Sequence, residues 1–154
     1  MPKAADIMTH AVVSVKPDQT LEEAVQLLSK NNISGLPVVD SENKVVGIMS
    51  ETDIVKYSSS LHVVSLINSS RWISPHTDVS QLTSIKKGFE KLSETRVEAV
   101  MSKKVVCVKK NTSGEEIARL MKKSKVNRLP VEDENGKLVG IITRGNLVNY
   151  LAGK

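Results

Sequence analysis

Hydrophobic and polar positions change their spacing along the chain, and the same succession occurs twice. In the first occurrence the β-branched run 12–15 predicts a short strand. Residues 21–30 carry apolar side chains every three or four positions, which predicts a helix with one buried face. The runs 36–39 and 45–50 predict two more strands joined by a polar turn, and residues 52–57 predict a short closing helix. The predicted order is therefore β-α-β-β-α.

The long helix has the same start signal in both occurrences. Thr20 is followed three positions later by Glu23, and Ser113 is followed in the same way by Glu116. This spacing predicts a capping box, in which the hydroxyl and the carboxylate each accept a hydrogen bond from an otherwise unpaired backbone N–H group. An Asn-Gly pair at 135–136 predicts a tight hairpin turn in the second occurrence, because both residues tolerate a positive φ.

The two occurrences are copies of one unit. Residues 8–57 overlay residues 101–150 at a constant offset of 93 positions without a gap, and identical pairs include Met8/Met101, Leu36/Leu129, Pro37/Pro130, Gly47/Gly140 and Tyr57/Tyr150. Two copies are too few for a solenoid. We therefore expect an α/β (α+β) fold in which tandem repeats pack about a pseudo-two-fold axis.

The stretch between the copies, residues 58–100, has no counterpart in the repeat and is expected to be a partly helical linker. Residues 69–80 are polar and predict a loop. Residues 82–100 have helical spacing of their apolar positions and predict one helix or a broken pair.

Composition and charge narrow the classes of function. Apolar residues make up 40% and charged residues 25% of the 154 positions, the balance of an ordinary globular protein. No apolar run reaches the ~18 residues of a membrane span, and no secretory signal is visible, so a cytoplasmic protein without membrane contact is expected. Residues 101–154 contain 12 Lys and Arg against 5 Asp and Glu. This excess predicts an anionic partner, either a polymer or a small phosphate ester.

Side chains for catalysis or metal binding are not arranged in any pattern that would indicate such a site. His10, His62 and His76 are scattered without ligand spacing, so no metal is expected. Cys107 aligns with Ser14 in a core-type strand and is expected to be a buried small side chain. No glycine-rich loop or nucleophile motif is present, so we expect neither an enzyme nor a bound cofactor.

The repeated pattern is similar to a known family. Met-(Thr/Ser)-x-x-Val-Val, a capped helix, x-Leu-Pro-Val-x-Asp and Val-Gly-Ile-x-(Ser/Thr) resemble the cystathionine-β-synthase-type (CBS) repeat. The resemblance implies a tandem pair, called a Bateman module, with two clefts between its repeats. It also implies ligands that contain adenosine, such as AMP, ADP, ATP, S-adenosylmethionine or NAD, and regulation of an enzyme or transporter. Since the pair accounts for the whole chain, a stand-alone module is expected.

One candidate ligand motif lies where the second strand of the first hairpin becomes a helix. Ser50-x-x-Asp53 resembles the family's nucleotide signature, Ser/Thr-x-x-Asp. A helix N-terminus favours a phosphate group, and a carboxylate one turn into the helix can accept hydrogen bonds from both ribose hydroxyls. The alternative is that Ser50 and Asp53 form a helix cap and nothing more.

The resemblance also implies that each cleft combines residues of both repeats. The expected main nucleotide cleft contains Ser50, Thr52, Asp53, Lys103, Val108, Asn127 and Arg128. The expected second, weaker cleft contains His10, Val15, Ser34, Gly35, Thr143 and Asn146. Arg128 stands where similar proteins place a phosphate-binding arginine, and its counterpart is Gly35. Because Asn146 replaces the aspartate, the second cleft is expected to lack both the carboxylate and the cation.

Three functions remain open from the sequence. The first is a regulatory sensor of an adenine nucleotide, with an unknown client protein. The resemblance further implies a homodimer formed through the helices that follow Asp53 and Asn146. The second is nucleic-acid binding by the basic C-terminal half, although aromatic residues for stacking make up only 3% of the chain. The third is an interaction scaffold whose clefts stay empty.

Overall fold

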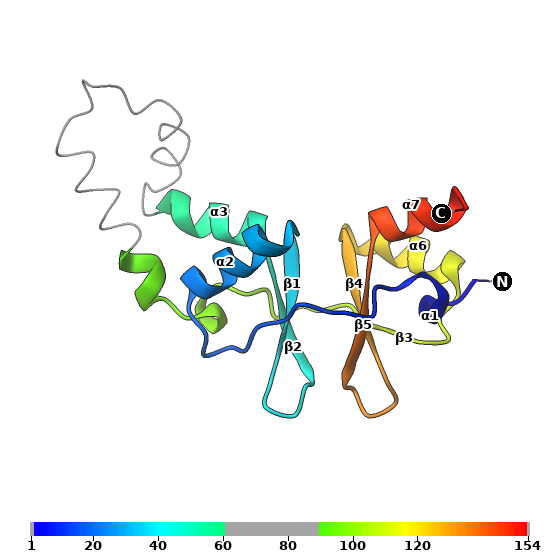
Figure 1. The fold of residues 1–154 in the computed structure, drawn as a ribbon, viewed down its shortest axis with the longest axis horizontal. Helices are drawn as coiled ribbons and strands as arrows, with labels where there is room; N and C mark the ends of the chain where they lie inside the picture. The colour runs from blue at the N-terminus through cyan, green and yellow to red at the C-terminus, as the bar shows by residue number, and fades with distance from the viewer. Residues whose placement is uncertain (1, 61–89, 154) are drawn as a thin grey trace, which may run out of the picture.

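The computed structural model describes residues 2–60 and 90–153, with side chains as far as residue 57 in the first of these ranges. Two similar halves stand side by side, and each consists of a β-hairpin with two helices (Figure 1). The first half contains α2 (Leu21–Asn31), β1 (Gly35–Val39), β2 (Val45–Ser50) and α3 (Glu51–Ser60). The second contains α6 (Gly114–Ser124), β4 (Arg128–Glu132), β5 (Leu138–Thr143) and α7 (Arg144–Leu151). The remaining elements are α1 (Ala4–Ile7), the 3-10 helix η2 (Val97–Ala99) and β3 (Val108–Lys109). The α+β fold with two equivalent halves is confirmed.

The two hairpins have the same register. Gly35 lies opposite Ser50 in the β1–β2 pair, and Arg128 lies opposite Thr143 in the β4–β5 pair. Both antiparallel pairs show a shift in register next to the turn, in β1 and in β4. Since the repeat offset relates all four positions, the hairpins place equivalent residues at the starts of α3 and α7.

The strand predicted at 12–15 is wrong. Only Val15 pairs with the sheet there, as a single parallel bridge to Val38, whereas the second half has the two-residue strand β3 parallel to β4. The reason is the path of the chain: Thr9 is bridged to Ile141 in the second half, and the segment then crosses to the first half (Figure 1). It therefore reaches the first sheet only at its end.

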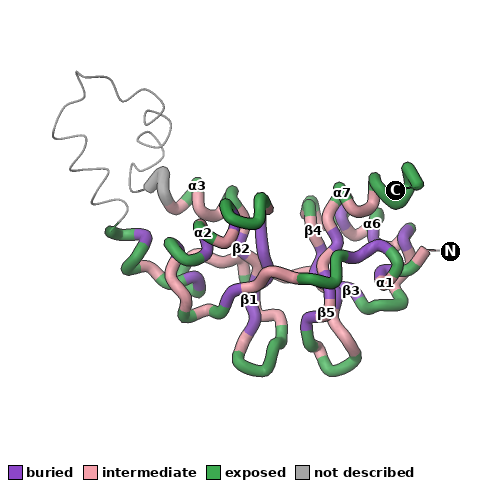
Figure 2. The backbone as a smooth tube through the Cα atoms, viewed as in Figure 1, coloured by how far each residue is buried: buried purple, intermediate pink, exposed green. Residues whose placement is uncertain are grey.

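The core of each half is completed by a short segment that lies outside the hairpin and helices of that half. Ala4, Ile7 and Met8 lie in the core of the second half, while Leu92 and Val97 lie in the core of the first. Figure 2 shows burial concentrated along the strands and the inner helix faces, with exposed hairpin turns. The two halves are thus joined by segments whose apolar side chains are buried in a core, and this burial favours their association.

Two methionines of these segments pack closely against glycines. A Cβ atom at Gly140 would lie 2.9 Å from Met8 Cγ, and a Cβ atom at Gly47 would lie 3.1 Å from Met101 Cγ. These glycines are equivalent in the repeat, and so are the methionines. The close approach accounts for both identities at once, because any larger side chain would displace a packed thioether.

Helices α2 and α6 each form one of the two hydrogen bonds that were predicted for their capping box. Thr20 Oγ1 accepts from the Glu23 N–H at 3.2 Å, and Ser113 Oγ accepts from the Glu116 N–H at 3.2 Å. The predicted return bonds are replaced. The Glu23 carboxylate accepts from Gln19 Nε2 at 2.9 Å, and Glu116 pairs with an arginine one turn further along its helix. Side-chain donors therefore replace the backbone N–H groups as the hydrogen-bond partners of Glu23 and Glu116.

The linker predictions are tested in part. The loop predicted at 69–80 and the first part of the helix predicted at 82–100 lie outside the described residues, as do His62 and His76. Residues 90–94 are helical, and η2 follows at Val97–Ala99. The helix therefore does not continue to residue 100, because the chain turns to form a bridge between Thr20 and Arg96. Within the described part of the chain, no helix has the length and apolar character needed to cross a bilayer.

Candidate functional site

Two cavities of similar size lie between the halves, where β2 leads into α3 and β5 leads into α7. The first, here called the Asp53 cleft, has a volume of about 360 Å³. Its lining is Ser34, Ile48, Ser50, Glu51, Thr52, Asp53, Ser102, Lys104, Lys125, Val126, Asn127 and Arg128. Both repeats contribute to it, and the volume lies in the range of small-molecule pockets.

Asp53 caps the start of α3 with one of its two carboxylate oxygens. Its Oδ2 accepts from the Ser50 N–H at 3.0 Å and from Ser50 Oγ at 3.0 Å, while the Asp53 N–H donates to Ser50 Oγ at 3.3 Å. Within residues 2–60 and 90–153, Oδ1 has no hydrogen-bond partner. The cap interpretation therefore accounts for only one oxygen of this carboxylate, and Oδ1 of the half-buried Asp53 remains an acceptor for a ligand.

Charge is concentrated in the Asp53 cleft. Lys104, Lys125 and Arg128 line it together with two carboxylates, Glu51 and Asp53. Burial lowers the pKa of Arg128, and the nearby charges of Glu51 and Asp53 act in the opposite direction. The three cations outnumber the two carboxylates, and the partly desolvated guanidinium interacts with an anion more strongly than an exposed cation does, because the local dielectric is below that of water.

The second cavity, here called the Asn146 cleft, has a volume of about 370 Å³. It is lined by Thr9, Ala11, Val13, Asn32, Ile33, Ser34, Gly35, Arg128, Ile141, Thr143 and Asn146. Arg128 is the one charged side chain in this lining. The cleft is thus less polar than its counterpart but does contain a cation.

Asn146 repeats the cap of Asp53, but its other amide atom is a donor that already makes one hydrogen bond. Its Oδ1 accepts from the Thr143 N–H at 2.9 Å and from Thr143 Oγ1 at 3.1 Å. Its Nδ2 donates to Thr9 Oγ1 at 3.3 Å. The amide is therefore engaged at both ends, where the aspartate presents a free oxygen.

Comparison with known proteins identifies the family. The sequence model of the CBS domain matches residues 4–60 and 97–153. The chain belongs to the CBS domain family. It is 35% identical over 150 residues to an uncharacterised protein, MJ1426, of Methanocaldococcus jannaschii, covering 95% of this chain and 89% of the relative.

Two plant CBS proteins are also similar. CBSX1, a chloroplastic protein of Arabidopsis thaliana, is 38% identical over 136 residues, which cover 87% of this chain and 56% of CBSX1. The crystal structure of CBSX2 in complex with AMP has a TM-score of 0.73 and 30% identity, and the match covers 99% of this chain and 98% of that one. The tandem CBS fold is thereby shown, and the cytoplasmic location expected from the sequence stays a prediction.

Most residues expected at the main cleft of this CBS pair do line the Asp53 cleft: Ser50, Thr52, Asp53, Asn127 and Arg128. Two do not. Lys103 is exposed, and its neighbours Ser102 and Lys104 line the cleft instead, because successive side chains of an extended segment point in opposite directions. Val108 is buried in the core of the second CBS domain.

The same pattern holds at the second cleft of the CBS pair. Ser34, Gly35, Thr143 and Asn146 line it. His10 is exposed and its neighbours Thr9 and Ala11 line the cavity, again by alternation. Val15 is 1% exposed and belongs to the core of the first domain.

The expectation that the second cleft lacks a cation is corrected by the position of Arg128. This side chain extends across the boundary between the CBS domains, lies against Gly35 and donates from Nη2 to Ser34 Oγ. It consequently lines both clefts. Sequence comparison assigned it to one cleft because the motif reveals the position of a Cα atom, not the reach of a long side chain.

Sequence reasoning missed Glu51, Lys104, Lys125 and Thr9. Lys125 belongs to the basic run 122–125, a pattern that by itself indicates cations at the solvated C-terminal end of a helix. It follows α6 with a left-handed φ of 54°, so the chain reverses there and brings it to the cleft.

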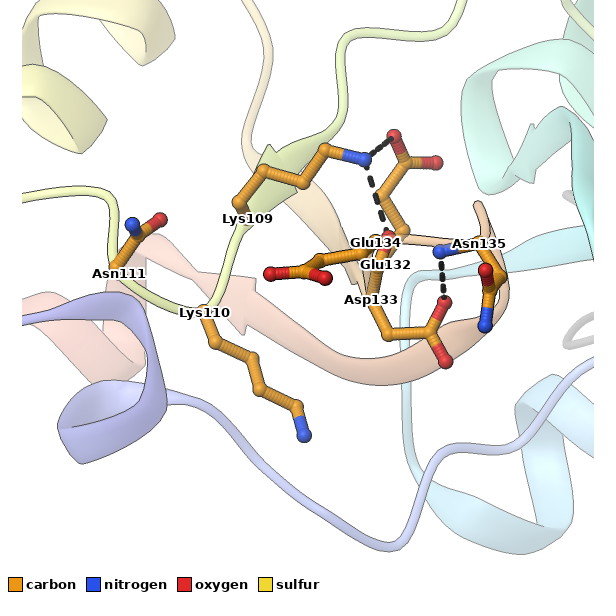
Figure 3. Close-up of a pocket in the computed structure, with 7 residues that line it drawn as sticks. All are labelled: Lys109, Lys110, Asn111, Glu132, Asp133, Glu134 and Asn135. Carbon is orange, nitrogen blue, oxygen red and sulfur yellow. Dashed lines mark hydrogen bonds and ion pairs between the residues drawn. The ribbon is translucent and has the colours of Figure 1, made fainter.

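A larger cavity than the two clefts lies elsewhere, at the far end of the second CBS domain (Figure 3). It has a volume of about 660 Å³, and Lys109 is paired within it: Lys109 Nζ lies 2.9 Å from Glu132 Oε1 and donates to the Asp133 carbonyl at 3.1 Å. A smaller cavity occupies the equivalent place in the first domain, beside Lys16 and Asp40. The hollow is therefore a feature of the repeat itself.

Cys107 is partly buried rather than fully buried. Burial, and secondarily the charge of Glu132, raises the pKa of its thiol to about 11. The thiol is protonated at neutral pH and is therefore a poor nucleophile.

Proposed function

We propose that this CBS domain pair is a regulatory sensor that binds an adenine nucleotide in the Asp53 cleft. The observation that carries the proposal is the presence of an unused carboxylate oxygen of Asp53 and the guanidinium of Arg128 in the lining of one cavity. An adenosine phosphate combines neighbouring ribose hydroxyls, which are donors, with an anion, and the cleft presents the complement of each.

In this arrangement the ribose hydroxyls donate to Asp53 Oδ1. The phosphate lies near the N-terminus of α3 and the cations Lys104, Lys125 and Arg128, where a helix dipole and positive charge act together. The base contacts the apolar side chains of Ile48 and Val126. CBSX2, which was solved with AMP, shares the fold over nearly the whole chain, and this supports the choice of ligand.

Nucleotide binding acts on a partner or on self-assembly through the differential affinity of two states. A ligand shifts an equilibrium only as far as it binds one state better than the other. The cleft is built from both CBS domains, so an occupied cleft favours one relative placement of α3 and α7. A client protein or a second copy that contacts these helices would sense the change.

A thermal-shift screen tests the proposal. AMP, ADP, ATP, S-adenosylmethionine and NAD are added to the wild type, to Asp53→Ala and to Asn146→Ala, which removes the equivalent cap of α7 without touching the Asp53 cleft. We expect at least AMP or ATP to raise the Tm of the wild type and of Asn146→Ala, but not of Asp53→Ala.

Other outcomes would support the other functions. Binding of a nucleic acid that falls steeply with salt and is insensitive to Asp53→Ala would favour the polymer interpretation. An unchanged Tm with every nucleotide would favour a scaffold with empty clefts and would contradict the sensor.

We also infer that a second copy of the chain covers α3 and α7. Both helices lie along the same edge of the molecule (Figure 1), and they carry exposed apolar side chains: Val55, Val148, Tyr150 and Leu151. A face made of two equivalent helices suits an isologous two-fold contact. Leu151 is 76% exposed, so Leu151→Glu should convert a dimer to a monomer in light scattering, whereas a monomeric wild type would exclude this interface.

A further inference from the structure

Arg128 lies between the two clefts, and among the described charged residues that line them it alone lines both. In the repeat its counterpart is Gly35, and Arg128 lies against that same Gly35. A residue that contacts its own counterpart lies at the axis that relates the two halves. The axis can hold one guanidinium, since a second arginine at position 35 would occupy the same space and bring two like charges together.

The packing at Gly35 is tight. A Cβ atom there would lie 2.5 Å from Arg128 Cζ and 2.8 Å from Nε. Arg128 also donates to Ser34, which lines both clefts as well. The guanidinium is therefore held on the first repeat by one hydroxyl and one surface contact, while the carboxylates that act on it, Glu51 and Asp53, line the Asp53 cleft.

We propose that Arg128 is one anion-binding side chain shared by the two clefts, so that an anionic ligand in one cleft weakens the binding of an anionic ligand in the other. This inference rests on the proposed nucleotide binding. A phosphate in the Asp53 cleft draws the guanidinium toward it. The Asn146 cleft then has no cation in its lining, because Arg128 is the one charged residue there.

The coupling depends on ligand charge. An uncharged nucleoside in the Asn146 cleft does not need Arg128, so it leaves the AMP affinity of the Asp53 cleft unchanged. Two AMP molecules compete for the guanidinium, and the binding of each lowers the affinity for the other by the same factor, as linkage requires. The protein would thereby respond to one anion plus one neutral ligand differently from two anions.

Two isoleucines allow the clefts to be observed separately. Ile48 lines the Asp53 cleft, and its counterpart Ile141 lines the Asn146 cleft. In the full chain with labelled isoleucine δ1-methyl groups, NMR titration with AMP or with adenosine gives one occupancy curve for each cleft. We expect AMP in the Asp53 cleft to weaken AMP binding in the Asn146 cleft by about tenfold, within the usual range of coupling between sites. Adenosine titrated alone carries no phosphate, so its two occupancy curves should be independent of each other.

Three variants separate the shared side chain from general charge. Arg128→Ala should weaken AMP in both clefts and make the two curves independent. Gly35→Ala keeps Arg128 but places a methyl group in its resting position, and should reduce the coupling without removing the cation. Lys104→Ala removes a cation that lines the Asp53 cleft alone, so it should weaken that cleft and leave the coupling intact.

The results that overturn the inference differ from those that overturn the function. Independent AMP curves in the wild type would exclude coupling while leaving nucleotide binding in place. Coupling that persists in Arg128→Ala and fades with salt would assign it to repulsion between phosphates and overturn the role of Arg128. If neither methyl group responds to AMP, the proposed nucleotide site fails, and the shared arginine fails with it.

Discussion

The Asp53 cleft and the Asn146 cleft have the same framework, because equivalent parts of the repeat form them, but they present different functional groups to a ligand. In both, a side chain three residues after a Ser or Thr accepts two hydrogen bonds from that residue and caps the next helix. Both helix starts also donate to the residue before the first hairpin strand, Glu51 to the Ser34 carbonyl at 2.9 Å and Arg144 to the Asn127 carbonyl at 3.0 Å. The scaffold of the two clefts is thus equivalent bond for bond.

The difference lies in what each cap leaves exposed. Asp53 leaves an anionic oxygen, whereas Asn146 leaves one neutral N–H group, because its other N–H donates to Thr9 of the N-terminal segment. The first cleft adds two lysines and a glutamate, whereas the second adds the apolar side chains of Ala11 and Val13. Duplication therefore preserved the backbone frame and changed the ligand chemistry at a few side chains, which is how one fold hosts different sites.

The largest effect on AMP affinity is expected when the carboxylate of the Asp53 cleft is replaced by the amide found in the Asn146 cleft. Asp53→Asn keeps an acceptor for the cap but replaces the free carboxylate oxygen with an amide NH₂. Charge-assisted hydrogen bonds are about twice as strong as neutral ones, so AMP affinity should fall by about tenfold in calorimetry. Equal affinity in the variant and the wild type would show that Asp53 is only a cap. The thermal stability without ligand serves as the control and should change little.

The reverse exchange should have a smaller effect. Asn146→Asp retains the cap, and the Thr9 hydroxyl can donate to the new carboxylate. AMP affinity at the Asn146 cleft should rise by roughly threefold to tenfold, the fraction of a charged hydrogen bond not already used by Thr9. Thr9→Ala in the same background should raise it further. A decrease on adding the carboxylate would mean that the phosphate, not the ribose, lies beside residue 146.

Lys104 allows a third test of the charge difference. Its ammonium group is exposed, and exposed ion pairs contribute little, so Lys104→Ala should weaken AMP binding by about twofold to fivefold. The salt dependence of AMP binding should decrease, and adenosine affinity should stay the same. Lys103→Ala is the matched control, since that neighbour does not line the cleft. An equal loss in the two variants would place the phosphate outside the cavity.

The smallest effect is expected where the two halves do not differ. Asp40 Oδ1 accepts from the Glu42 and Lys44 N–H groups, and Asp133 Oδ1 accepts from the Asn135 and Lys137 N–H groups, at 2.8–3.0 Å. The backbone hydrogen bonds, from Lys44 and Lys137 first, lower the pKa of each carboxyl. A lowered pKa stabilises the fold above the unfolded pKa of about 4, and this contribution is lost as the pH falls through the folded value.

Asp40→Asn and Asp133→Asn should therefore each lower the Tm slightly at pH 7, and the difference from the wild type should vanish in strong acid. Melting curves between pH 7 and pH 2 measure this. A large difference between the two variants would break the equivalence of the two hairpin turns.

Much of the fold was predictable because residues close together in the chain specify most elements of the repeat. Short apolar runs placed β1 and β2, and the Thr20 and Ser113 caps placed α2 and α6. The strand at 12–15 was predicted wrongly, since the β-branched run is equally suited to a crossing segment that meets its sheet only at Val15. Local preference does not specify whether a partner strand lies within reach.

The candidate site was predictable to within one residue at its extended segments. Lys103 and His10 were chosen where Lys104 and Thr9 line the clefts, because a one-residue error in an extended segment reverses the direction of the side chain. Val15 and Val108 were placed at the clefts and lie in the cores. The direction of a side chain depends on which face of the sheet is covered, and the covering segments come from the opposite half.

By itself, the sequence determined the duplication, the hairpins with their capped helices and the difference between Asp53 and Asn146, since each of these is specified by residues close together in the chain. Tertiary structure alone decided which segments complete which core and that one arginine serves both clefts. Exchange of Met8 and Met101 between halves and the meeting of Arg128 with Gly35 depend on contacts across the pseudo-two-fold axis, and no local pattern encodes the distance between two surfaces.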